Sequence, residues 1–118
     1  MTAARAGLLQ AVRAGYGGAL LVAPGPVIRA AARGPDGPRA RAVARVLGAR
    51  HLLQAALTTA AGWSPEALWV GVAVDLMHAA SMAALAADRR VRRLTLTDAL
   101  LEATFAAAGG SAARPRPA

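Results

Sequence analysis

Long apolar stretches, separated by breaks rich in glycine and proline, dominate the pattern of the chain. The stretches cover residues 3–23, 39–61, 65–87 and 96–108. The breaks include Pro24-Gly25-Pro26 and the run 34–38, where proline removes backbone donors and stops a helix. Val, Ile, Phe and Tyr are too few for a β-sheet protein. The pattern therefore predicts an all-α protein of four helices over these stretches, with one or two further helical turns at 27–33.

Local signals mark where some of these helices begin and end. Ser64-Pro65-Glu66 places an N-cap serine, a first-turn proline and an acidic residue at the start of the third helix. Thr95-Leu96-Thr97-Asp98 resembles a capping box before the fourth helix, and Gly109-Gly110 should stop that helix. We therefore expect one helical domain over 1–110 and a flexible tail over 111–118.

The third helix allows a choice between water and lipid as its surroundings. Its 21 residues between Glu66 and Asp88 can span about 30 Å of hydrocarbon. Asp75 near its centre costs roughly 2.5–3.5 kcal/mol on insertion, and six Leu and Val residues return about 2–4 kcal/mol in total. With a partner for Asp75 the helix can cross a bilayer, although the other three segments are also borderline. This favours a transmembrane four-helix bundle, multi-pass in the cell membrane.

Composition narrows the class of protein further. The 118 residues suffice for one domain, hydrophobic residues make up 56% of them and charged residues 17%, and cysteine is absent. Disorder, a disulfide scaffold and a cysteine metal cluster are therefore excluded. The net charge of +8 could bind nucleic acid or an anionic membrane surface. Because no aromatic residues interleave the arginines to stack on bases, the sequence argues against nucleic acid and favours the lipid bilayer as partner.

The arginines also predict an orientation. The two segments that hold Arg29–Arg45 and Arg89–Arg93 carry nine arginines, against four near the termini, including Arg13. The positive-inside rule places both segments in the cytoplasm and both termini outside. Trp63 and Trp69 should then lie near the lipid headgroups on the outer side.

Polar residues inside the apolar segments form the candidate site. Arg50 and Gln54 share one face of the second helix, and Asp75 and His78 share one face of the third. We expect Arg50 and Asp75 to form a buried ion pair, with Gln54 and His78 extending the contact. One interpretation of these residues is a charge pair whose only role is to permit membrane insertion and helix packing. Another interpretation is a proton relay or a small-molecule binding site. In a soluble protein the same residues would lie at the surface.

Other candidate chemistry is weak. His51, His78 and Asp75 are three potential ligands, but no metal-binding spacing occurs, so we predict no metal and no cofactor. No nucleophile turn or phosphate loop is found, so no catalytic residue is assigned. Asp98 and Glu102 are like charges one turn apart and should face water. A row of small residues every fourth position predicts a close helix contact along Gly7, Ala11, Gly15, Ala19 and Ala23.

Two runs carry a resemblance to known proteins. They are Val43-Ala44-Arg45-Val46-Leu47-Gly48-Ala49-Arg50-His51-Leu52-Leu53-Gln54 and Val74-Asp75-Leu76-Met77-His78-Ala79-Ala80-Ser81-Met82. They resemble the second and third helices of small four-helix actinobacterial membrane proteins of unknown function, broadly DoxX-like in architecture. The resemblance implies an integral membrane protein and supplies no reaction.

The sequence thus predicts an integral membrane protein, more consistent with a structural or interaction component than with an enzyme. Its expected partners are the bilayer and either a second copy of itself or another membrane protein. One alternative is a soluble or peripheral helical binding module. Another is a membrane transporter or redox accessory that uses the buried Arg/Asp/His site. A cleaved N-terminal signal peptide, with Ala30-Ala31-Ala32 at the cleavage site, is a further interpretation.

Overall fold

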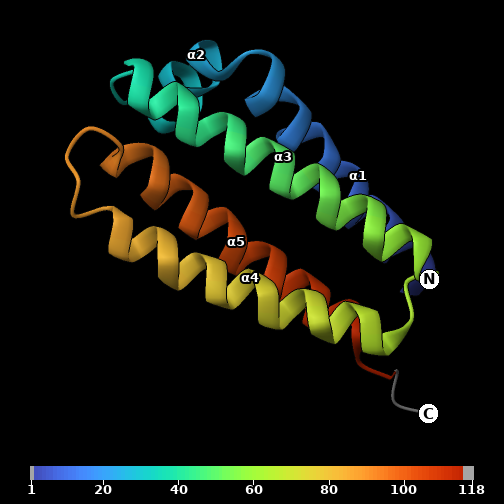
Figure 1. The fold of residues 1–118 in the computed structure, drawn as a ribbon. Coiled ribbons are helices and arrows are strands. Elements are labelled where there is room, and N and C mark those ends of the chain that lie inside the picture. Colours follow the sequence, from blue (N-terminus) through green and yellow to red (C-terminus); the bar gives the residue numbers. More distant parts are fainter. Residues whose placement is uncertain (1, 116–118) are drawn as a thin grey trace.

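A computed structural model describes residues 2–115, and every regular element in that range is helical (Figure 1). The elements in chain order are α1 (Thr2–Val22), α2 (Pro24–Val27), the π-helix η1 (Ile28–Ala32), α3 (Pro38–Ala60), α4 (Pro65–Leu85) and α5 (Arg92–Ala113). The prediction of an all-α protein is confirmed.

The predicted count of four helices is not confirmed, because the short α2 is a fifth α-helix in this range. Pro24 and Pro26 do stop α1, but proline also suits the first turn of a new helix, where its missing N–H has no partner to lose. The chain therefore begins α2 at once and turns by 117° relative to α1. It then runs through η1 to Arg33, whose φ of 52° ends that segment.

The long helices form two pairs (Figure 1). Helix α1 packs along α3, and α4 packs along α5, while fewer contacts join one pair to the other. The molecule is elongated, with extents of 50 × 25 × 19 Å. At one end lie α2, η1 and the α4–α5 connection, and at the other lie the start of α1 and the α3–α4 connection. The two ends of the molecule thus contain different elements, and the middle is formed by the four long helices alone.

Two glycines allow α1 and α3 to pack closely. A Cβ added at Gly48 would lie 2.5 Å from the carbonyl oxygen of Gly17, and one added at Gly17 would lie 2.8 Å from the carbonyl oxygen of Gly48. The predicted row of small residues is therefore wrong in register. Ala11, Gly15 and Ala19 are exposed, and a Cβ at Gly15 would meet nothing within 4 Å.

The local signals account for one helix end and fail at two others. Ser64 caps α4 as predicted, since its Oγ accepts a hydrogen bond from the N–H of Ala67 at 3.2 Å. Helix α5 begins at Arg92, not at 96, and continues through Gly109-Gly110 to Ala113. Gly110 faces the ring of Trp69, so tertiary packing overrides the weak helix propensity of glycine. The predicted tail is thus helical over 111–113, and residues 116–118 lie outside the described residues.

The interior has apolar ends and a charged middle. One apolar cluster includes Leu20, Ile28 and Val91 near the α2 end of the molecule. A smaller cluster at the other end joins Leu68 to Ala6, Ala112 and Ala113, with Trp63 packed against them. Between them the buried side chains are largely polar. In an ordinary soluble protein the centre of the interior is apolar, whereas here it is charged.

Hydropathy marks one helix as a possible membrane span. Over the described residues, α4 alone is long and apolar enough by itself, with a mean hydropathy of 1.6 over 18 residues. The bent pair formed by α1 and Pro24–Ala32 passes the same test if it is taken as one span. A single helix of this kind also occurs in soluble cores, although only 11% of this window in α4 is buried by the rest of the protein. Hydropathy therefore does not support the predicted multi-pass arrangement.

Candidate functional site

The charged middle of the interior is the candidate site, and we call it the buried charged cluster. Each long helix contributes to it, and it contains three of the six acidic residues of the chain. Its members are Arg13 and Tyr16 from α1, Arg50, His51 and Gln54 from α3, Asp75 and His78 from α4, and Asp98 and Glu102 from α5.

Asp75 is held by a guanidinium from another helix pair. Arg13 Nη1 and Nη2 donate to Asp75 Oδ1 and Oδ2, each at 2.7 Å, and both side chains are 2% exposed. Gln54 Nε2 donates to Asp75 Oδ1 at 2.8 Å. The planar fork of arginine matches a carboxylate in this two-bond geometry, which fixes both distance and orientation. The pair therefore joins α1 to α4.

Arg50, expected to be the principal partner of Asp75, binds Glu102 more closely. Its Nη1 donates to Glu102 Oε1 at 2.8 Å, and its Nη2 lies 3.7 Å from Asp75 Oδ1. Arg13 reaches the same site because it lies on the face of α1 that carries the buried residues Gln10 and Leu20. Arg13 was counted among the four charges near the termini, but it is consequently part of the buried site.

Asp98 and Glu102 are fully buried, so the prediction that they face water is wrong. Their mutual repulsion is offset by Arg50 at Glu102 and by three donors around Asp98. His51 Nε2 lies 3.1 Å from Asp98 Oδ1, and His78 Nε2 lies 2.9 Å from Asp98 Oδ2. Tyr16 donates its hydroxyl hydrogen to Asp98 Oδ1 at 3.2 Å. Burial of one acidic turn of α5 is thus possible because the other three long helices supply its partners.

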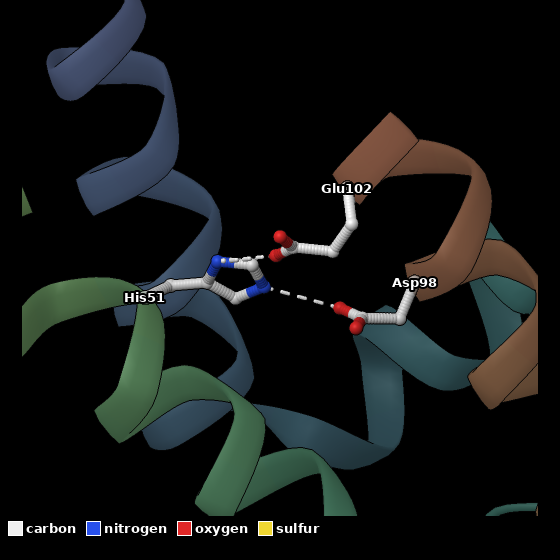
Figure 2. A group of neighbouring side chains, drawn as sticks. All are labelled: His51, Asp98 and Glu102. Carbon is white, nitrogen blue, oxygen red and sulfur yellow. Dashed lines mark hydrogen bonds and ion pairs between the residues drawn. The ribbon is translucent and has the colours of Figure 1, made fainter. Parts of the chain in front are cut away.

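His51 lies between the two carboxylates of α5 (Figure 2). Its Nε2 contacts Asp98, and its Nδ1 lies 3.1 Å from Glu102 Oε1. The second contact has the length of a hydrogen bond but not its angle, so Nδ1 has no hydrogen-bond partner although the side chain is fully buried. The ring is enclosed edge-on by Tyr16 and Phe105, at centroid distances of 5.0 and 5.9 Å. An imidazole held between two acids is suited to binding and exchanging a proton.

The structure brings the four predicted site residues, Arg50, Gln54, Asp75 and His78, into this single cluster. Sequence reasoning did not include the other five members in the site. Two of these, Asp98 and Glu102, share their face of α5 with the buried Phe105. That spacing at i, i+4 and i+7 is a sequence signal for an inward face, and it was outweighed by the expectation that like charges are solvated.

A metal ion is a poor fit to the cluster. His51, Asp98 and Glu102 each offer a ligand atom, and these atoms lie within 4.8 Å of one another. However, Glu102 already accepts from Arg50 at 2.8 Å, and its other oxygen lies 3.9 Å from Arg13. A divalent cation bound by Glu102 would lie within a few ångströms of two guanidinium groups and would be repelled by both. The arrangement suits ion pairs and protons better.

Two hollows adjoin the cluster. A groove of about 380 Å³ between α3 and α4 is lined by aliphatic side chains such as Leu57 and Val70 and reaches Arg50 and Gln54. A cavity of about 10 Å³ beside Asp75 is lined by Gln10, Arg13 and Gln54, each of which has one buried polar atom without a hydrogen-bond partner. That volume matches one water molecule, which could serve these three atoms.

Ion pairs of a different kind connect the segments at the α2 end. Arg39 Nε lies 2.8 Å from Asp88 Oδ2, and Arg93 Nη1 donates to the carbonyl of Arg33 at 3.3 Å. The hydrogen bond from Arg41, at 3.0 Å, and that from Arg29 hold the pKa of the partly exposed Asp36 below its ordinary value of 3.8. The contacts place the two arginine-bearing segments, 29–45 and 89–93, at the same end of the molecule.

Comparison of the chain with known protein families, with curated proteins and with solved structures gave no match. The resemblance to small actinobacterial membrane proteins therefore stays a prediction.

Proposed function

We propose that the protein is an integral membrane protein whose long helices α1, α3, α4 and α5 cross the bilayer. The observation that carries the proposal is the reversed distribution of side chains. Seven large apolar residues are 62–84% exposed on the outside of these helices: Leu8, Val22, Val46, Leu57, Val70, Met77 and Leu100. Soluble monomers rarely expose apolar surface on this scale, whereas lipid is a favourable neighbour for it.

The charged interior supports the same proposal. Arg, Asp and Glu are almost never fully buried in soluble proteins unless they are paired, and ionisable residues within membrane-spanning segments almost always face the bundle interior and pair with one another. Here Arg13, Asp75, Asp98 and Glu102 are each at most 2% exposed. These inward charges also lower the hydropathy of their helices, so a hydropathy window misses helices whose charges are neutralised by partners.

Length and orientation fit a bilayer as well. The four helices have 21–23 residues each, which is about 32–35 Å at 1.5 Å per residue. The nine arginines of segments 29–45 and 89–93 gather at one end. By the positive-inside rule this end would face the cytoplasm, with the Trp63 turn at the opposite surface.

The role that best suits this arrangement is a structural or interaction component. The cluster ties the α1–α3 pair to the α4–α5 pair, and the apolar exterior is available to lipid, to a second copy or to another membrane protein. A second candidate is a membrane protein that handles protons, such as a transporter or redox accessory. The specific observation in favour of it is the imidazole of His51 between two buried carboxylates.

The proposal can be tested by fractionation and by topology. We expect the expressed protein to stay in the membrane pellet after extraction with alkaline carbonate. Reporters inserted after Gly34 and fused after Ala118 should report opposite sides, with Gly34 in the cytoplasm. Recovery of a monomer in the soluble fraction would overturn the proposal and favour the soluble binding module. Three proposed membrane crossings, α3, α4 and α5, separate the two reporters. Reporters found on the same side would therefore refute the proposed four-helix topology.

A further inference from the structure

We infer that the buried charged cluster is a binding site for one exchangeable proton, held between His51 and Glu102. The inference rests on burial and charge within the cluster and not on the surroundings of the helices. It would therefore hold in a bilayer or in water.

The first argument is the charge balance. Asp75, Asp98 and Glu102 bring three negative charges when ionised, and Arg13 and Arg50 bring two positive charges. With both histidines neutral, the cluster carries a net charge of −1. An uncompensated charge in a buried site is strongly unfavourable. One added proton makes the cluster neutral, wherever in the cluster it is bound.

The second argument is the pattern of donors and acceptors, which locates the proton. Asp75 is satisfied as an anion by Arg13 and Gln54. Asp98 faces a tyrosine hydroxyl and the Nε2 atoms of two histidines, so it is satisfied as an anion when both Nε2 atoms carry hydrogen. A neutral His51 with its hydrogen on Nε2 has only a lone pair on Nδ1.

That lone pair lies 3.1 Å from Glu102 Oε1. Two lone pairs at this distance repel each other, and the repulsion ends when a proton binds to either atom. Binding at Nδ1 makes an imidazolium beside a carboxylate, and binding at Oε1 makes a carboxylic acid beside a neutral imidazole. A small rotation of the Glu102 carboxyl group would correct the angle of the contact, since Nδ1 has no other partner.

Groups from all four helices face this proton. They are Arg13 and Tyr16 on α1, Arg50 on α3, Asp75 and His78 on α4, and Asp98 on α5. The side chains of Arg50 and His78 are 21% and 13% exposed, and Tyr16 is also partly exposed. Arg50 borders the groove between α3 and α4, and His78 connects to His51 through Asp98. A guanidinium does not give up its proton in a protein, so Arg50 stays charged and His78 is the residue through which a proton can exchange with the outside. Only three contacts lead from His78 through Asp98 and His51 to Glu102. This short chain of contacts can store a proton but does not extend across the molecule to conduct one.

The composition of the chain makes a direct test possible. Its two histidines are His51 and His78, and its two glutamates are Glu66 and Glu102. We would record ¹⁵N spectra of histidine-labelled protein and infrared spectra of glutamate-labelled protein near neutral pH, assigned with His78→Gln and Glu66→Gln. The expected result is either a doubly protonated His51 or a protonated carboxyl at Glu102. A singly protonated His51 together with an ionised Glu102 would overturn the inference, as would a proton found on His78 instead.

A pair of variants tests the charge balance. Glu102→Gln removes one negative charge, so the extra proton should be lost and His51 should carry hydrogen on Nε2 only. The exposed Glu66→Gln removes the same charge outside the cluster and should leave the His51 spectrum unchanged. A doubly protonated His51 in Glu102→Gln would contradict the balance. Should that variant fail to fold, the spectra of the unsubstituted chain still decide the question.

Discussion

The buried pair of Arg13 and Asp75 should be the strongest single tie between the two helix pairs. The substitutions Arg13→Met and Asp75→Asn each remove one charge and keep much of the volume. Each single variant leaves a buried charge without its bidentate partner, which typically costs 3–5 kcal/mol. Gln54 at 2.8 Å and Arg50 at 3.7 Å still approach Asp75 in Arg13→Met. We therefore expect the lower end of this range, about 3 kcal/mol.

The double variant should lose far less stability than the sum of the single losses, because neither charge is then left alone. The matched control is the pair Arg39 and Asp88. Its contact distance of 2.8 Å is close to the 2.7 Å of the buried pair, but its side chains are 55% and 25% exposed. A surface pair of this kind couples by about 0.2–1 kcal/mol. The coupling of Arg13 with Asp75 should exceed it by at least about 1.5 kcal/mol, or tenfold in an unfolding equilibrium constant.

The free energies of unfolding can be measured by circular dichroism in mixed micelles for both double-mutant cycles. Equal coupling in the two cycles would refute the reasoning, because it would mean that burial does not strengthen the Arg13–Asp75 interaction. Strictly additive losses for Arg13 and Asp75 would mean that the two residues do not interact at all.

Three further predictions concern other parts of the fold. Gly48→Val should lower the unfolding free energy by more than about 2 kcal/mol, because even its Cβ would lie 2.5 Å from the carbonyl oxygen of Gly17. The control Gly15→Ala should be neutral or stabilising by about 0.5–1 kcal/mol, because a Cβ there meets nothing within 4 Å. Equal effects of the two substitutions in thermal melts would contradict the close packing of α1 on α3. Ser64→Ala should cost about 1 kcal/mol through loss of the α4 cap, and an unchanged melting temperature would argue against that cap. The contribution of Asp36 to stability should be present above its ordinary pKa of 3.8 and disappear as the pH falls through its lower folded-state pKa. The difference in melting temperature between the unsubstituted chain and Asp36→Asn should therefore shrink toward acid pH, and a difference independent of pH would refute this.

The sequence by itself determined the helical class and the local ends that rest on neighbouring residues. Proline at 24 and glycine and proline over 34–38 stop helices through backbone chemistry, and Ser64 caps α4 through a hydrogen bond three residues away. It also placed the four predicted polar residues on inward positions, because a charge within an apolar segment has few other places to go. The helix ends could be inferred because their causes act within one helical turn.

Only the tertiary structure decided which charges meet and which glycines matter. Arg13 binds Asp75 across 62 positions of the chain, and Glu102 is buried because Arg50 on another helix neutralises it. Gly110 stays helical because Trp69 packs on it, and Gly17 faces Gly48 because of the register between α1 and α3. The physical reason is that the free energy of a buried charge or a close backbone contact depends on its partner, and spacing along one helix does not specify the partner.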